Sequence, residues 1–132
     1  MTTTCHLACI LLAATWPVVA PAQATTPVQL QRDYEASAGR GGRPDLGHAF
    51  FTARHGGEWS CASCHGDRPT GQGRHVVTGK PLDPLAPAFH APAFTDARRV
   101  EKWFRRNCRD VLARECTSAE KADVLAWLQS LR

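Results

Sequence analysis

The sequence predicts a small all-α protein, and three observations carry that prediction. Two segments near the C-terminus have apolar residues at helical spacing behind residues typical of helix N-caps. The segment from Pro69 to His90 is rich in proline and glycine, which disfavours a regular sheet. The chain has 132 residues, 43 % of them hydrophobic, which fits one globular domain.

Residues 1–24 are predicted to be a secretory signal peptide, and residues 25–132 the mature domain. An apolar run from Leu7 to Val19 precedes Ala22-Gln23-Ala24, which matches a small-residue cleavage site. The start of the chain lacks Lys and Arg, so an uncleaved anchor is the alternative. The apolar run is short and contains Pro17, which favours cleavage. We expect an exported, soluble mature protein in a bacterial periplasm.

The first half of the domain is predicted to contain two helices. One is expected over residues 25–38, with Val28, Leu30 and Tyr34 as its apolar positions. Asp45 is expected to cap a second, short helix. The apolar residues of that helix are Leu46, Phe50 and Phe51. The loop that follows is expected to be irregular, apart from residues 75–78, which are candidates for a brief extended segment.

The two C-terminal helices are predicted more clearly. The first is expected to begin near Thr95 or Asp96. One face of it carries Val100, Trp103, Phe104 and Asn107, at offsets typical of a helix. The second begins with Thr117-Ser118-Ala119-Glu120, a capping-box pattern. Its apolar stripe consists of Val124, Leu125, Leu128 and Leu131, with Trp127 beside it.

A five-residue motif, Cys61-Ala62-Ser63-Cys64-His65, concentrates the chemistry of the chain. The C-x-x-C-H spacing is typical of c-type haem attachment. Cys61 and Cys64 would form thioether bonds to the haem, and His65 would be the proximal iron ligand. A zinc site would need further ligands at suitable spacing, and a thioredoxin-like site would need a βαβ context. Neither pattern is present, so one covalent haem c is the expected cofactor.

The remaining cysteines agree with export. Cys5 and Cys9 lie in the predicted leader, which leaves Cys108 and Cys116 in the mature chain. In an oxidising compartment such a pair, eight residues apart, is most simply a disulfide.

The second axial ligand of the iron is the open question, because no methionine follows Met1. The candidates are His48, His55, His75, His90, Asn107, Lys80 and Cys116, besides water or no ligand. His75 and His90 lie in the loop expected to cross a haem edge. Asn107 shares a helix face with Trp103 and directly precedes Cys108, although an Asn near a helix end is also typical of a C-cap.

The choice of ligand separates two kinds of function. An amide oxygen is a hard, weak ligand that suits ferric iron better than ferrous iron. Its release on reduction would leave a five-coordinate site that binds O₂, NO or CO. A haem with two His ligands would stay six-coordinate and act in electron transfer only.

The positive charge of the chain is uneven. The formal net charge is +4, and seven basic residues gather in one segment: Arg98, Arg99, Lys102, Arg105, Arg106, Arg109 and Arg114. This segment is either a solvated helix face or a docking surface for an acidic redox partner. Nucleic acid is not an expected partner for an exported haem protein.

The chain from Phe50 to Leu131 resembles the sphaeroides haem protein type of monohaem cytochrome c. Three blocks carry the resemblance: residues 61–67 (CASCHGD), residues 78–81 (TGKP) with 84–87 (PLAP), and residues 102–108 (KWFRRNC) followed by 114–117 (RECT). The last block is the most specific.

The resemblance implies a class I cytochrome c fold and assigns roles to six residues. Cys61 and Cys64 attach the haem, and His65 is the proximal ligand. Asn107 is the labile distal ligand of ferric iron, and Cys108 pairs with Cys116 beside the haem. The family also implies binding of diatomic gases and electron exchange with a diheme c-type or a membrane b-type cytochrome.

Two other functions remain as alternatives. One is a simple electron carrier ligated by His75 or His90. The other is a haem enzyme, which would oxidise NO at a ferrous–oxygen adduct or act on sulfur compounds with Cys116 as a ligand. The sulfur version needs a free Cys116 thiol.

Overall fold

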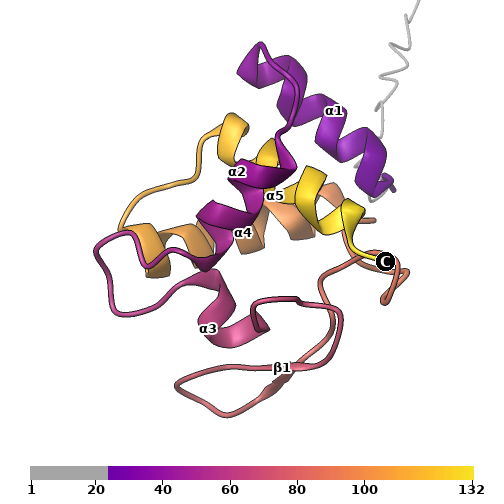
Figure 1. Cartoon of the computed structure of the whole chain (residues 1–132). Helices are drawn as coiled ribbons and strands as arrows, with labels where there is room; N and C mark the ends of the chain where they lie inside the picture. The colour runs from indigo at the N-terminus through magenta and orange to yellow at the C-terminus, as the bar shows by residue number, and fades with distance from the viewer. Residues whose placement is uncertain (1–23) are drawn as a thin grey trace, which may run out of the picture.

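The computed structural model describes residues 24–132, which form five helices and one two-stranded antiparallel sheet (Figure 1). The helices are α1 (Pro27–Ala38), α2 (Pro44–Thr52), α3 (Cys61–His65), α4 (Ala97–Leu112) and α5 (Ser118–Ser130), and the strands are β1 (Gly73–Arg74) and β2 (Pro81–Leu82). The mostly helical class is confirmed. The predicted leader, apart from Ala24, lies outside the described residues.

Helix α1 confirms the predicted N-terminal helix. The Thr26 hydroxyl accepts a hydrogen bond from the Gln29 backbone N–H, and Pro27 occupies the first helical position. Gly39 ends the helix with φ of 68°, a conformation that glycine adopts without strain. Leu30 and Tyr34 are buried as predicted, but Val28 is 50 % exposed.

Helix α2 starts earlier than predicted, and Asp45 does not cap it. Pro44 takes the first helical position, where its missing N–H leaves nothing unpaired, so the cap falls on Arg43. Asp45 lies in the first turn and pairs with Arg43, with 3.0 Å between Oδ2 and Nη2. Phe51 is buried as predicted, whereas Leu46 is 39 % exposed.

The chain between α3 and α4 is a long loop with one short β-hairpin (Figure 1). Gly73 faces Leu82 and Arg74 faces Pro81 across the two strands. The expectation of an extended segment at residues 75–78 is wrong, because these residues make the turn of the hairpin. The His75 Nδ1 atom accepts the backbone N–H groups of Val77 and Thr78, which stabilises the turn.

Helices α4 and α5 begin as the sequence predicts. The Asp96 side chain accepts from the Arg99 N–H at the start of α4, and Thr117 and Glu120 form a reciprocal capping box at the start of α5. Helix α5 supplies much of the core. Its buried apolar residues are Ala122, Val124, Leu125, Trp127 and Leu128, and Leu131 follows directly after it.

The core of the described residues consists of two clusters that share α5. One contains Phe51 of α2 with Trp127 and Leu128, and half-buried residues that include Cys61. The other contains Leu30 and Tyr34 of α1 with Val100 and Leu125. The helix that carries the C-x-x-C-H motif therefore packs against the first cluster.

Gly47 allows α2 and α5 to cross closely. A Cβ atom at this position would lie 2.0 Å from the Asp123 carbonyl oxygen, so no side chain fits there. Asp123 itself is buried, and its carboxylate accepts hydrogen bonds from Nη1 and Nη2 of Arg40, at 2.8 and 2.7 Å, and from the Arg43 backbone N–H at 2.8 Å. These contacts fasten the segment between α1 and α2 to α5. Between residues 24 and 132, no helix is both long enough and apolar enough to cross a membrane.

Candidate functional site

Helix α3 is short, and local hydrogen bonds define both of its ends. The hydroxyl of Ser60 accepts the Ser63 N–H, and the hydroxyl of Ser63 accepts the Ser60 N–H. Gly66 directly after His65 has φ of 77° and ends the helix. This capping box places Cys61 and Cys64 one helical turn apart, with His65 next to them. Sequence analysis missed the box, although its signal, a serine three residues before another, is visible in the chain.

Residues from two sides hold α3 in place. The His65 ring lies 6.2 Å from the buried Phe51 ring, between centroids. On the other side, β1 comes so close that a Cβ atom on Gly73 would lie 2.4 Å from the Cys64 carbonyl oxygen. The motif is thus fixed between α2 and the hairpin, at the side of the molecule opposite α1 (Figure 1).

The His65 imidazole has the properties of a ligand for a metal that is not part of the polypeptide. Burial lowers the pKa of His65 to about 4, so the imidazole is neutral at pH 7, the form that binds iron. Its Nδ1 atom is buried and has no hydrogen-bond partner among the described residues. A buried polar atom without a partner destabilises a fold by about 1–3 kcal/mol, so a ring nitrogen left unpaired here fits a ligating role.

The two cysteines of the motif fit thioether attachment better than the competing uses. Both are free and half-buried, and burial raises the pKa of the Cys61 thiol to about 11. A thioredoxin-like pair needs a lowered thiol pKa, which is the opposite shift. Across residues 24–132, no three His, Cys, Asp or Glu side chains come together in a metal-binding group. Two thiols and a neutral imidazole on one helical turn match the groups that attach haem c and bind its iron.

Asn107 lies in the last third of α4, five residues before its end. The alternative that it is a helix C-cap is wrong, because Ala113 fills that position with φ of 57°. Asn107 and Trp103, one turn apart, are both exposed, whereas Val100 and Phe104 turn towards the core. Within the described part of the chain the Asn107 amide makes no hydrogen bond, so its oxygen is available to a ligand.

A disulfide joins the end of α4 to the start of α5, as expected. Cys108 and Cys116 are both buried, and their Cα atoms lie 5.6 Å apart. Because Cys108 follows Asn107 directly, the disulfide restrains the backbone of Asn107. It also removes Cys116 from the candidate ligands and leaves the sulfur-oxidising alternative without its free thiol.

The other candidate ligands are mostly engaged elsewhere. His48 stacks on Trp127 at 4.9 Å between ring centroids, and the Nε2 atom of His55 lies 2.8 Å from the Phe50 carbonyl oxygen. His75 uses Nδ1 in the hairpin turn. His90 is half-buried at the end of a turn, and Lys80 is exposed. The stacking of His48 on Trp127 was not predicted, because the two residues are distant in sequence.

Comparison with known proteins identifies the family. The model of a family described as a domain of unknown function (DUF1924) matches residues 37–128. The cytochrome c-type protein SHP of Cereibacter sphaeroides is 45 % identical over 123 residues, which cover 90 % of this chain and 95 % of that protein. The chain belongs to the sphaeroides haem protein type of c-type cytochrome. Its cofactor is therefore haem c.

Further relatives of this cytochrome agree with that assignment. Cytochrome c'' of Methylophilus methylotrophus is 40 % identical over 95 residues, or 72 % of this chain and 65 % of that protein. The structure of oxidised SHP, an oxygen-binding cytochrome c, matches with a TM-score of 0.75 at 46 % identity, over 80 % of this chain and 96 % of that one. Oxidised cytochrome c'' matches with a TM-score of 0.72 at 33 % identity, over 80 % and 94 %.

Proposed function

We propose that this cytochrome is an exported electron-transfer protein whose ferric iron is ligated by Asn107 and whose ferrous iron binds O₂, NO or CO. When bound, the haem would supply one-electron redox chemistry and a place for a gas ligand at its iron. Cys61 and Cys64 would hold it covalently, and His65 would bind its iron. With a signal peptide at residues 1–24, the compartment would be the periplasm.

The observation that carries the proposal is the state of Asn107. Its amide has no hydrogen-bond partner among the described residues. The next residue in α4, Cys108, is held by the disulfide to Cys116. An amide oxygen that has no partner within the protein would be free to bind the iron. Because it is a weak, hard ligand, reduction of the iron favours its release and opens the site to a gas.

Two relatives support the same properties for this family. SHP is described as an oxygen-binding cytochrome c. A solution structure of cytochrome c'', which matches this chain with a TM-score of 0.70 at 33 % identity, concerns haem-ligand detachment. A labile distal ligand is therefore consistent with what is said of both proteins.

The His-ligated electron carrier is the second candidate, and only His90 favours it. His90 lies in the loop, is half-buried and makes no side-chain hydrogen bond among the described residues. His75 is a poorer candidate, because the turn already uses one of its nitrogens. Oxidation of NO would be an extension of gas binding and would need the same open site.

The test is the ferric optical spectrum of the purified holo-protein with single substitutions. Asn107→Ala should convert a six-coordinate low-spin spectrum to a high-spin or water-bound one, with the fold retained. His90→Ala is the matched control and should leave the spectrum unchanged. The reverse pattern, in which only His90→Ala changes the spectrum, would assign the iron to His90 and reject the proposal.

A further inference from the structure

Helix α4 has a large excess of positive charge. It contains six basic and two acidic side chains, a net of +4, which equals the formal net charge of the whole chain. At 3.6 residues per turn, the six basic residues fall within an arc of about 120°, and both acids lie outside it. These six residues, which we call the basic face, are Arg98, Arg99, Lys102, Arg105, Arg106 and Arg109.

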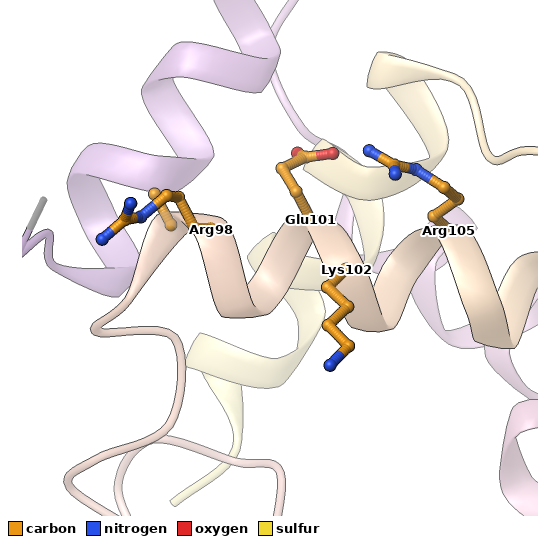
Figure 2. Close-up of a pocket in the computed structure, with 5 residues that line it drawn as sticks. Arg98, Glu101, Lys102 and Arg105 are labelled. Carbon is orange, nitrogen blue, oxygen red and sulfur yellow. The ribbon is translucent and has the colours of Figure 1, made fainter. Parts of the chain in front are cut away.

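Most of the basic face is not neutralised within the protein. Glu101 lines a hollow together with Arg98, Lys102 and Arg105, but its carboxylate is bonded to Tyr34 and to Lys121, whose Nζ lies 2.8 Å away. Glu115 pairs with Arg109 at 2.8 Å and reaches Arg105 at 4.0 Å. Among residues 24–132, the other four cations have no carboxylate within 4.0 Å. Figure 2 shows Lys102 projecting from α4 on the side opposite Glu101, while Arg105 lies on the same side as Glu101.

An aromatic residue stands at the edge of the basic face. Trp103 is 46 % exposed, and the guanidinium of Arg106 lies over its ring, 5.6 Å from the centroid. Trp103, Arg98, Arg99 and Lys102 line one hollow in the surface. Trp and Arg are the residues that most often dominate the energy of protein–protein interfaces. Trp103 is also one helical turn from Asn107, so this edge of the basic face adjoins the proposed distal ligand.

We propose that the basic face of α4 is the docking surface for an acidic redox protein. Unpaired cations on one helix face complement a cluster of carboxylates and attract it over several ångströms at low salt. Arg98, Arg99, Lys102 and Arg106 make the contact, because none of them has a carboxylate within 4.0 Å among residues 24–132. The inference deepens the proposed function by placing electron exchange on the side of α4 that leads to Asn107.

The experiment measures binding of flavodoxin, a strongly acidic one-electron carrier, to the ferric holo-protein at about 20 mM and about 200 mM salt. The test variant is Arg99→Glu/Arg106→Glu, which reverses two unpaired cations of the basic face. The control is Arg32→Glu/Arg132→Glu, which changes net charge equally through exposed residues outside α4. Haem spectra and circular dichroism verify that both variants are folded.

Binding should weaken with salt and fall by about tenfold or more in the test variant, but by less than about threefold in the control. Equal loss in both variants would reduce the effect to net charge and overturn the proposal. Retention of binding by the test variant would do the same. Binding to phosphatidylglycerol vesicles, lost in the test variant while flavodoxin binding is unaffected, would assign the face to a membrane instead.

The two proposals fail separately. Asn107→Ala should bind flavodoxin as the unmodified protein does, since Asn107 lies outside the basic face. A normal ferric spectrum in that variant would refute the ligand assignment and leave the docking surface standing.

Discussion

Asp123 is the buried acid on which the contact between α5 and the α1–α2 segment depends. Its hydrogen bonds to Arg40 are the main reason that the pKa of this carboxyl lies below its ordinary value. The Arg43 N–H bond and the nearby positive charges act in the same direction, and burial opposes them. No sequence pattern pointed to Asp123, because Arg40 is 83 residues away along the chain.

We expect Asp123→Asn to destabilise the folded protein by about 1–3 kcal/mol at pH 7, because charge-assisted hydrogen bonds are lost and donors stay unpaired. A lowered folded-state pKa stabilises the protein above the unfolded value, near pH 4, and this stability is lost as pH falls through the folded pKa. Urea unfolding at several pH values should therefore show the difference shrinking below about pH 4.

The control for this prediction is Asp45→Asn. Asp45 also pairs with an arginine, but both side chains are exposed, so the change in stability should be much smaller than that of Asp123→Asn at every pH. An equal loss in the two variants would show that burial of Asp123 has no special effect.

Asn107 illustrates what can be predicted for a single residue. The helical spacing correctly placed it on one side of α4 with Trp103, since periodicity depends on local geometry alone. Exposure could not be predicted in this way. Val100 and Phe104 are covered because α1 and α5 pack on that side, while Trp103 and Asn107 lie just outside the covered strip.

At the scale of elements, the starts of α4 and α5 were predictable because N-caps are local, whereas α1 begins at Pro27, two residues later than expected. Asp96, Thr117 and Glu120 act within four residues of the bonds they make. The start of α2 was predicted wrongly because Pro44, directly before Asp45, is a stronger signal for the first helical position. The exposure of Val28 and Leu46 depends on which neighbouring helices cover them. A local sequence pattern cannot predict that coverage.

The crossing of α2 and α5 should not tolerate a side chain at Gly47. We expect Gly47→Ala to destabilise the protein by about 3 kcal/mol or more, because the new Cβ would meet backbone atoms of Asp123 that cannot move without shifting α5. Gly41→Ala is the matched control, since a Cβ there meets nothing within 4 Å. Thermal unfolding of the two variants compares them, and equal midpoints would contradict the close crossing.

We expect the disulfide to act as a staple between α4 and α5 and not as a redox switch. Replacing both Cys108 and Cys116 with Ser should lower the free energy of unfolding by about 2–3 kcal/mol, the value typical of so short a loop. The ferric spectrum and the CO affinity should stay unchanged. A change of more than about threefold in CO affinity, measured by titration of the reduced protein, would instead indicate that the disulfide controls the position of Asn107.

At the scale of the whole molecule, the fold class and the donor set on α3 were predictable from sequence. The C-x-x-C-H motif is contiguous, so its residues are neighbours in any fold. The basic face of α4 was visible only as a run of charges, and the structure was needed to show which cations are paired. Its relation to Trp103 follows from helix geometry combined with the burial of the opposite side.

The central claim is that reduction releases the distal ligand and opens the iron to a gas. It is tested most directly by the optical spectrum of the holo-protein when oxidised, reduced, and reduced under CO. We predict a six-coordinate ferric spectrum that becomes high-spin on reduction and then shifts with CO. A low-spin ferrous spectrum that is indifferent to CO would contradict the claim and leave a His-ligated electron carrier.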